Sequence, residues 1–256
     1  MIEITRKAYA SDITDDQWDA IAPLFSHLRN FKWPKRELVN ALLYVLVNGI
    51  KWRNLPHDFP PWKTVYSFYS RAIKSGLWDE ILQFLVEITR QIEDRKAQPS
   101  YAIIDSQSVR TISASVERGI DGGKKIKGRK RHIVVDTMGN LLSVKVHAAN
   151  IHDTSSGIWA AETALLNYPE IQKFCADAGY RGSFVDAMKE KFKMEVDVVK
   201  RSDSEHWRIL PKRWIVERTF AWLNNYRRLS KDYEINVVYA ESMIKIAASY
   251  ILLKRL

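Results

Sequence analysis

Three carboxylates occur in sequence contexts that can bring them to one site. Asp105 follows the apolar run 101–104 and Asp177 follows the apolar run 174–176, so each aspartate ends a segment typical of a short buried strand. Glu217 differs, because it lies in a segment of helical periodicity whose aromatic residues fall on the opposite side. We therefore expect its carboxylate to face away from the core and to be available for chemistry.

The chemistry that suits such a cluster is metal-assisted attack on a phosphodiester. Mg²⁺ and Mn²⁺ prefer oxygen ligands, and two such ions about 3.5–4 Å apart can activate an attacking oxygen and stabilise a leaving one. Three carboxylates brought together without a cation would repel one another, so a cluster would imply the metal. Taken singly, a strand-end aspartate is more often a loop acid or a helix cap.

The elements that must position these acids fall into two parts. Residues 14–95 have helical patterns, which begin with a capping box at Thr14–Gln17 and are interrupted by a turn-rich, basic and aromatic connection over 51–62. Three or four short helices of this kind are compatible with a helix-turn-helix module. A polar stretch without apolar periodicity follows. We therefore predict a helical domain over 1–97 and a second domain over 98–256.

The second domain alternates strands with helices, and we expect an α/β fold with a ribonuclease-H-like mixed sheet and flanking helices. The expected order is a strand ending at Asp105, a hairpin within 133–146, a helix near 155–166, a strand ending at Asp177, a helix near 183–192, a strand at 195–199, the helix of Glu217 and a final helix near 237–251. In open sheets of this sort, sites form at the carboxyl ends of strands, where both aspartates lie.

Composition points to a polyanion as the partner. The chain has 40 Lys and Arg against 30 Asp and Glu, and no isolated basic amphipathic helix, so we expect nucleic acid rather than a membrane. The single Cys175 excludes an internal disulfide and suits a reducing compartment. No signal peptide is recognisable and no apolar run reaches roughly 18 residues, which favours a soluble intracellular protein. No GxxxxGK phosphate loop is present, so we expect no nucleotide cofactor.

Two basic stretches flank the acids. The first carries six cations in the eight positions 124–131, with glycines that would let it follow a phosphate backbone, and the second, residues 200–231, holds nine Lys or Arg against three acids. A charge run alone is as often a solvated surface as a binding site. Beside a metal-type acid cluster, we expect the first stretch to contact DNA phosphates through Lys124, Lys125, Lys127, Arg129, Lys130 and Arg131.

Other acids and aromatic residues have competing interpretations. Asp136 lies in an apparent hairpin turn, where local hydrogen bonding is favoured over metal binding. Asp153 could join His147 and His152 as a metal trio, but its position before a predicted helix favours a helix cap. Trp207 and Trp214 could stack on an unpaired base, although packing in the core is the preferred interpretation for both.

Four motifs in this order resemble the bacterial insertion-sequence transposases of family five, within the DDE superfamily. The motifs are IDSQSV at 104–109, the glycine-lysine-arginine run ending in GRKRH at 128–132, ADAGYRG at 176–182 and VERTFAWL at 216–223. The amino half agrees, because TDDQW at 14–18, WRNLP at 52–56 and FPPW at 59–62 resemble the helical domain that precedes the catalytic domain in that family. The resemblance covers the chain from about residue 13 to its end.

The resemblance implies a DNA transposase. Such an enzyme would bind the terminal inverted repeats of its element, cleave by metal-activated water and join 3′-hydroxyl ends to target DNA. Asp105, Asp177 and Glu217 would hold two Mg²⁺ ions, with Mn²⁺ as a substitute. The partners would be double-stranded DNA, as element ends and as target, and a second copy of the chain in a homodimer on DNA. The location would be the cytoplasm, at the nucleoid when DNA is bound.

One part of the pattern departs from the related family four, which places Tyr seven residues before the Glu and Lys seven after it. This chain has Leu210 and Asn224 there. Arg213, on the helix face of the Glu, would touch a phosphate by analogy, and the missing charge could come from Arg227, Arg228 or Lys231. Two alternative functions stay open, a structure-specific DNA nuclease on the same fold and a non-catalytic DNA-binding protein derived from a transposase.

Overall fold

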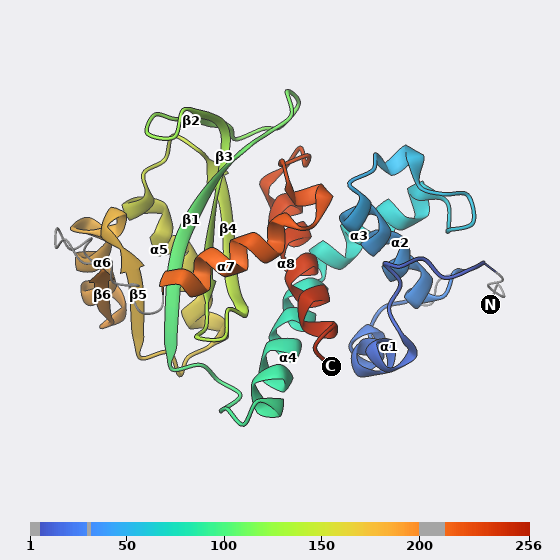
Figure 1. Cartoon of the computed structure of the whole chain (residues 1–256), viewed down its shortest axis with the longest axis horizontal. Coiled ribbons are helices and arrows are strands. Elements are labelled where there is room, and N and C mark those ends of the chain that lie inside the picture. Colours follow the sequence, from blue (N-terminus) through green and yellow to red (C-terminus); the bar gives the residue numbers. More distant parts are fainter. Residues whose placement is uncertain (1–5, 30–31, 200–212) are drawn as a thin grey trace.

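The structure, a computed structural model, describes residues 6–29, 32–199 and 213–256 (Figure 1). Its amino-terminal part is helical, as expected. The elements are α1 (Asp15–Ile21), η1 (Ala22–Phe25), α2 (Lys35–Asn48), η2 (Trp52–Asn54), α3 (Trp62–Lys74) and α4 (Leu77–Ile92).

Local sequence signals explain where α1 begins and where α2 ends. The capping box is confirmed, because the Thr14 hydroxyl accepts the Gln17 N–H at 3.2 Å and the Gln17 side chain accepts the Thr14 N–H at 3.1 Å. Gly49 ends α2 in the left-handed conformation, with φ 66°. A Cβ at Gly49 would lie 2.9 Å from the Cβ of Arg227, so glycine also lets a distant segment lie against α2.

The remainder of the chain forms a mixed sheet with helices around it. Its elements are β1 (Tyr101–Arg110), β2 (Gly119–Asp121), β3 (Ile126–Val135), β4 (Leu141–Ala148), α5 (Asp153–Asn167), β5 (Lys173–Asp177), η3 (Ala178–Tyr180), α6 (Ser183–Phe192), β6 (Glu195–Val199), α7 (Arg213–Asn224), η4 (Arg227–Leu229) and α8 (Val237–Leu253).

The strand order is that of a ribonuclease-H-like sheet. β4 pairs with β3 and β3 with β1 in antiparallel fashion, and β5 and β6 continue the sheet in parallel to β1. The short β2 pairs with the beginning of β3. α7 crosses the sheet in front of β1 in Figure 1, and α5 lies behind it. The predicted α/β fold class is confirmed.

The hydrophobic core is continuous between the helical part and the sheet. α8 is buried along most of its length and contacts both α4 and β4, so it joins the two parts. The division at residue 97 therefore stays a prediction. None of the described helices combines the length and apolarity that a membrane-spanning segment requires.

Candidate active site

The two aspartates lie side by side in the sheet. β1 and β5 are parallel neighbours whose pairing ends with Ile104 opposite Ala176, so Asp105 and Asp177 come next in register. Both side chains are half-buried. β1 does not end at Asp105, contrary to the sequence-based expectation, but continues to Arg110 because β3 goes on pairing with it. Asp105 therefore marks the end of the parallel pairing rather than the end of its strand.

Tyr180 is a buried phenol on the turn that follows the second aspartate. This side chain is 1% exposed and lies three residues after Asp177. Burial raises the pKa of Tyr180 well above its usual value, and the charges of Asp105, Asp153 and Asp177 raise it further. Asp177 also accepts the Gly179 N–H at 2.9 Å, which caps the turn that carries Tyr180. The charges of both aspartates therefore act on the pKa of this one buried phenol.

Glu217 is positioned by the docking of α7 onto the β3–β4 turn. Thr219 Oγ1 donates to the Gly139 carbonyl at 2.9 Å, and Arg218 Nη2 donates to the Met138 carbonyl at 2.9 Å. Gly139 has φ 85°, and a Cβ there would come within 2.9 Å of Thr219 Oγ1, so a side chain would obstruct this docking. The Glu217 side chain is exposed, as the helical pattern predicted.

The donor chemistry of these acids fits divalent metal ions. Carboxylates from β1, β5 and α7 would supply an all-oxygen set of the kind that Mg²⁺ prefers. α7 contacts both strands and crosses β1 in Figure 1. In the part of the chain that the structure describes, no three His, Cys, Asp or Glu side chains are grouped closely enough to hold an ion. The three elements that carry the acids are therefore in contact with one another, and the binding of a metal ion by all three carboxylates stays a prediction.

The first basic stretch forms a strand rather than a flexible loop. Because β3 begins at Ile126 and is paired on both sides, its side chains are fixed, and Arg129, Lys130 and Arg131 are 0%, 7% and 3% exposed. Lys127 stays exposed. Three of the six expected phosphate contacts are therefore not available to DNA in this structure.

The buried cations have partners inside the protein. Arg129 donates to Asp232 at 3.0 Å and to the carbonyl groups of Val116, Glu234 and Ile235. Lys130 Nζ lies 3.0 Å from the Asp153 carboxylate and donates to the Ile151 carbonyl at 3.0 Å. Arg131 donates to the Leu229 carbonyl at 2.8 Å, and burial lowers its pKa to about 10. The covering segment 227–235 lies about 100 residues after β3, and the segment 112–118 has no regular secondary structure, so no local pattern revealed this burial.

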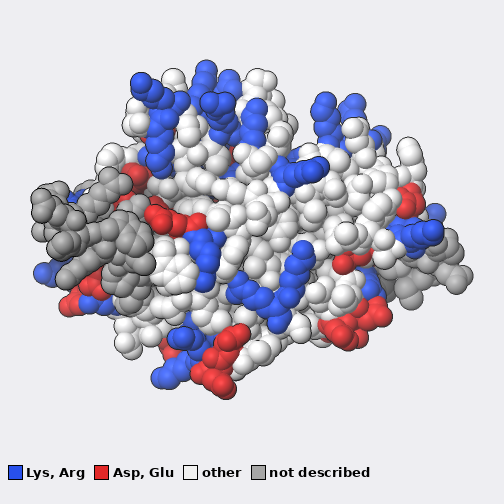
Figure 2. Space-filling model, in the orientation of Figure 1, with Lys and Arg blue, Asp and Glu red and all other residues white. Residues whose placement is uncertain are grey.

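Two of the three exposed cations of this stretch, Lys124 and Lys125, lie on the turn before β3, and the third, Lys127, lies at the start of the strand. Asp121 is 8% exposed and organises the turn by accepting from Ser108 Oγ at 2.5 Å, from the Gly123 N–H at 3.1 Å and from the Lys124 N–H at 3.0 Å. Lys124 Nζ lies 3.5 Å from the carbonyl of Ser106, the residue after the first acid. Figure 2 shows basic side chains gathered over the β2–β3 end of the sheet.

The second basic stretch likewise contains both buried and exposed cations. Arg228 is 6% exposed, lies 2.7 Å from Glu234 and donates to the Ile50 carbonyl at 3.0 Å. Arg227 is exposed and Lys231 is half-buried. Arg213 begins α7, but its side chain lies outside the described residues, as does Leu210. Arg228 is thus held by the protein itself, whereas Arg227 can reach a ligand.

Two expectations about individual side chains are wrong. The cap of α5 is His152, whose Nδ1 accepts the Thr154 N–H at 3.3 Å, whereas the Asp153 carboxylate turns to Lys130 on β3. Trp214 is not a core residue, because it is 46% exposed, with the Arg218 guanidinium 4.4 Å from its ring centroid. Trp207 lies outside the described residues.

The expectation for Asp136 is confirmed. Its carboxylate accepts the N–H groups of Met138 and Asn140, each at 2.9 Å, which is turn chemistry. It also forms a buried ion pair at 2.6 Å with Arg90 of α4, a partner that no local sequence signal indicates.

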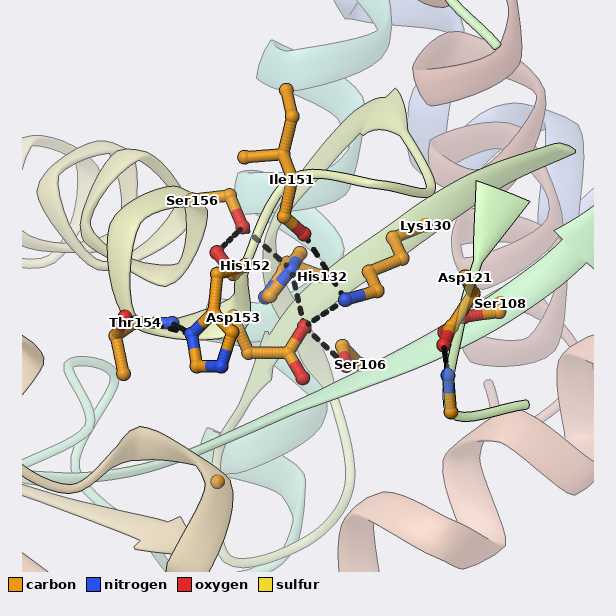
Figure 3. A network of polar contacts seen from close by, with 12 residues as sticks. Ser106, Ser108, Asp121, Lys130, His132, Ile151, His152, Asp153, Thr154 and Ser156 are labelled. Atoms are coloured by element: carbon orange, nitrogen blue, oxygen red, sulfur yellow. Dashed lines mark hydrogen bonds and ion pairs between the residues drawn. The ribbon is translucent and has the colours of Figure 1, made fainter. Parts of the chain in front are cut away.

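Sequence reasoning gave no role to several polar residues that surround the two aspartates. Ser106 Oγ donates to the Asp153 carboxylate at 3.1 Å, and His132 Nε2 lies 3.5 Å from the same carboxylate (Figure 3). The other ring nitrogen of His132, Nδ1, lies 2.9 Å from the Tyr180 hydroxyl. Their only sequence signal is position, since Ser106 follows the first acid and Tyr180 lies in the motif of the second. His132 ends the basic run and is fully buried.

Two families match this chain over consecutive stretches. Residues 96–252 match the family described as "Transposase DDE domain", and residues 13–82 match the family described as "Putative transposase of IS4/5 family". Together they cover the sheet, its helices and most of the amino-terminal helical part.

Individual relatives agree with these matches. The chain is 33% identical over 116 residues to "Putative transposase for insertion sequence element IS402" of Burkholderia cepacia, across 42% of this chain and 54% of that protein. It is 30% identical over 117 residues to "Uncharacterized protein y4sN" of Sinorhizobium fredii, across 44% of this chain and 87% of that protein. The chain thus spans about half the length of the IS402 relative.

One solved structure was also similar. It is described as "Mos1 transposase paired-end complex with left transposon end", with 13% identity, a TM-score of 0.26 and coverage of 89% of this chain and 81% of that one.

Proposed function

Since this chain belongs to the family of transposase DDE-domain proteins, we propose that it is the transposase of an insertion sequence, which cuts DNA at the element's ends and joins 3′-hydroxyl ends to target DNA. The observation that carries the proposal is the placement of Asp105 beside Asp177 at the end of parallel pairing, with α7 and its Glu217 across the same strands. The test is whether DNA carrying the repeats that flank the gene is converted into joined products in the presence of Mg²⁺.

The three acids would hold two Mg²⁺ ions, for which Mn²⁺ would substitute. When bound, such ions activate the attacking oxygen and stabilise the leaving one. The protein's own contribution is positional. Asp105 and Asp177 are fixed by strand register, and Glu217 is fixed by the contacts of α7 with the β3–β4 turn. Two element ends must be cut and joined together, so we propose that the chain acts on DNA as a homodimer, in the cytoplasm at the nucleoid.

The DNA backbone would approach from the basic turn before β3. Lys124 and Lys125 are exposed on this turn, Lys127 is exposed at the start of β3, and Lys124 reaches the strand of the first acid. Arg227 and Lys231 can extend this surface, and Arg213 begins the helix that carries Glu217. Cations on a firmly hydrogen-bonded turn suit contacts with phosphate, which fix the register of DNA without reading its sequence.

Replacing Lys124 and Lys125 together by Ala is expected to weaken binding to DNA of any sequence. Each lost phosphate contact should make the negative slope of log affinity against log salt shallower by about 0.9, so the slope of the double variant should be shallower by up to about 1.8. Titrations at several salt concentrations measure this slope. The exposed pair Lys189 and Lys191 on α6 serves as the control. An unchanged slope would make the turn ordinary surface.

The helical part, proposed as an end-binding domain over 1–97 before a catalytic domain over 98–256, offers its own DNA surface. A cavity of about 440 Å³ at η2 and α3 is bordered by cationic, aromatic and amide side chains, and no acid lines it. Its lining residues are Lys51, Trp52, Arg53, Asn54, Trp62 and Tyr66. Arg53 lies over the Trp62 ring, 5.7 Å from its centroid. Positive charge beside aromatic faces suits a nucleic-acid strand.

Changing Arg53 to Ala is expected to reduce affinity for the element's own ends roughly tenfold, about 1.4 kcal/mol, while non-specific binding changes less. Lys74 to Ala, at the other end of α3, removes the same charge from an exposed site outside the cavity and should have little effect. Competition between end DNA and unrelated DNA distinguishes a loss of end-specific binding from a loss of non-specific binding. Equal losses in both variants would contradict an end-binding role for this cavity.

A further inference from the structure

Polar side chains from four elements form a hydrogen-bonded network that the proposed chemistry does not use directly. Figure 3 shows the part of it around Asp153. The members of the network are Ser106 of β1, Lys130 and His132 of β3, Asp153 and Ser156 of α5, and Tyr180 of η3. Lys130, His132, Ser156 and Tyr180 are buried, which is costly for polar groups unless every hydrogen bond is satisfied.

Asp153 is the carboxylate in this network, and it contacts three of the other members. Its Oδ1 accepts from Ser106 Oγ at 3.1 Å, lies 3.0 Å from Lys130 Nζ and 3.5 Å from His132 Nε2. Burial opposes its ionisation, but the hydrogen bonds from His132 and Lys130 outweigh this and hold the pKa of Asp153 well below its usual range. The carboxylate is therefore ionised and acts only as an acceptor.

The hydrogen bonds fix the tautomer of His132. Ser156 Oγ donates to the His152 carbonyl at 2.9 Å, so toward His132 Nε2, 3.0 Å away, it acts as the acceptor. The proton is thus on Nε2, and Nδ1 accepts the Tyr180 O–H at 2.9 Å. Burial lowers the pKa of His132, which agrees with a neutral ring. The direction of donation runs from Tyr180 through His132 to Ser156 and Asp153.

The two ends of this chain of hydrogen bonds are attached to the two acids. Ser106 directly follows Asp105, and Tyr180 ends the turn that Asp177 caps. Gly157 of α5 holds the Tyr180 ring from the other side, since a Cβ there would come within 2.6 Å of Tyr180 Cε1. The network therefore links the residue after the first acid to the turn after the second, through α5 and β3.

We infer that Asp153, His132 and Tyr180, with Ser106, form a positioning relay that sets the separation of Asp105 and Asp177. Two carboxylates on neighbouring strands repel each other before metal binds, and a link between the segments that follow them opposes their separation. The relay residues touch neither DNA nor metal in this account and act through the aspartates. The inference deepens the proposed function and rests on it.

The decisive variant is Tyr180→Phe, which keeps the buried ring and removes only the O–H donated to His132. Mn²⁺ affinity, measured by calorimetry on the full chain without DNA, is expected to fall about tenfold or more. Losses of this size are typical when a residue that orients a metal ligand is removed. The cleavage rate should fall at low Mg²⁺ and recover toward wild type at high Mg²⁺, with DNA affinity unchanged. Ser106→Ala breaks the opposite end of the relay, with little buried volume lost, and should give the same pattern.

The matched control is Tyr250→Phe. Tyr250 is 2% exposed, and its O–H donates to the Ser11 carbonyl at 3.1 Å, so this variant loses a comparable buried hydrogen bond away from the acids. It should bind Mn²⁺ as the wild type does. If Tyr180→Phe and Ser106→Ala also bind Mn²⁺ like the wild type while the wild type cuts DNA, the relay is overturned alone. A wild type that neither binds Mn²⁺ nor cuts DNA would overturn the proposed function and the relay with it.

Discussion

Replacing Asp105, Asp177 or Glu217 singly by Ala is expected to reduce DNA cleavage roughly a thousandfold or more. Each substitution removes one oxygen ligand from the proposed metal site, and bound ions supply several kcal/mol of charge stabilisation at about 1.4 kcal/mol per tenfold in rate. DNA affinity should be retained, because the exposed cations Lys124 and Lys125 lie on a separate turn. Nicking rates report cleavage and binding isotherms report affinity, and both are measured on the same DNA.

The control for this series is Asp186→Ala. Asp186 is an exposed acid in the first turn of α6, and its removal makes the same change in charge without touching the proposed ligands. Its cleavage rate should match the wild type. Full activity in any one of the three acid variants would remove that residue from the site.

Changing Arg129 to Met is expected to lower the free energy of unfolding by about 3–5 kcal/mol, because it leaves the buried Asp232 charge without its partner. The side chains of this pair are 0% and 1% exposed, and the Arg129 guanidinium also satisfies three carbonyl groups. Urea unfolding at constant salt measures the loss, and affinity for DNA is measured on the fraction that remains folded.

Lys127→Met is the matched control, two residues earlier on the same strand but exposed. It should change stability by no more than about 0.5 kcal/mol and weaken DNA binding instead. The two variants are therefore expected to have opposite effects. An Arg129→Met protein as stable as the wild type but weaker on DNA would return Arg129 to the DNA surface.

Local signals in the sequence were sufficient for most of the order of elements and for several ends, although β2 and the first half of β3 were not expected. Thr14 forms its capping box, Asp136 forms its turn, and the strands of Asp105 and Asp177 are neighbours. These features depend on residues close in sequence or on the fold class as a whole. The exposure of Glu217 likewise follows from the period of a single helix.

What the sequence could not show depends on contacts between distant segments. Whether Arg129 faces water or protein is decided by Asp232, 103 residues away, and the pairing of Asp136 with Arg90 joins residues 46 apart. By residue type Asp153 is the favoured cap, but Lys130 and His132 draw this aspartate toward β3 and His152 caps α5 instead. A single sequence carries no record of such partners.

The most direct test of the central proposal is a strand-transfer assay with the purified full chain, Mg²⁺ and DNA that ends in the repeats flanking the gene, beside Asp105→Ala. Joined products that require Mg²⁺ and are absent from the Asp105→Ala reaction are the predicted result. Cleavage without joining would contradict the transposase and favour a structure-specific nuclease. Binding of the ends without cleavage or joining would contradict any catalytic role and favour a DNA-binding protein.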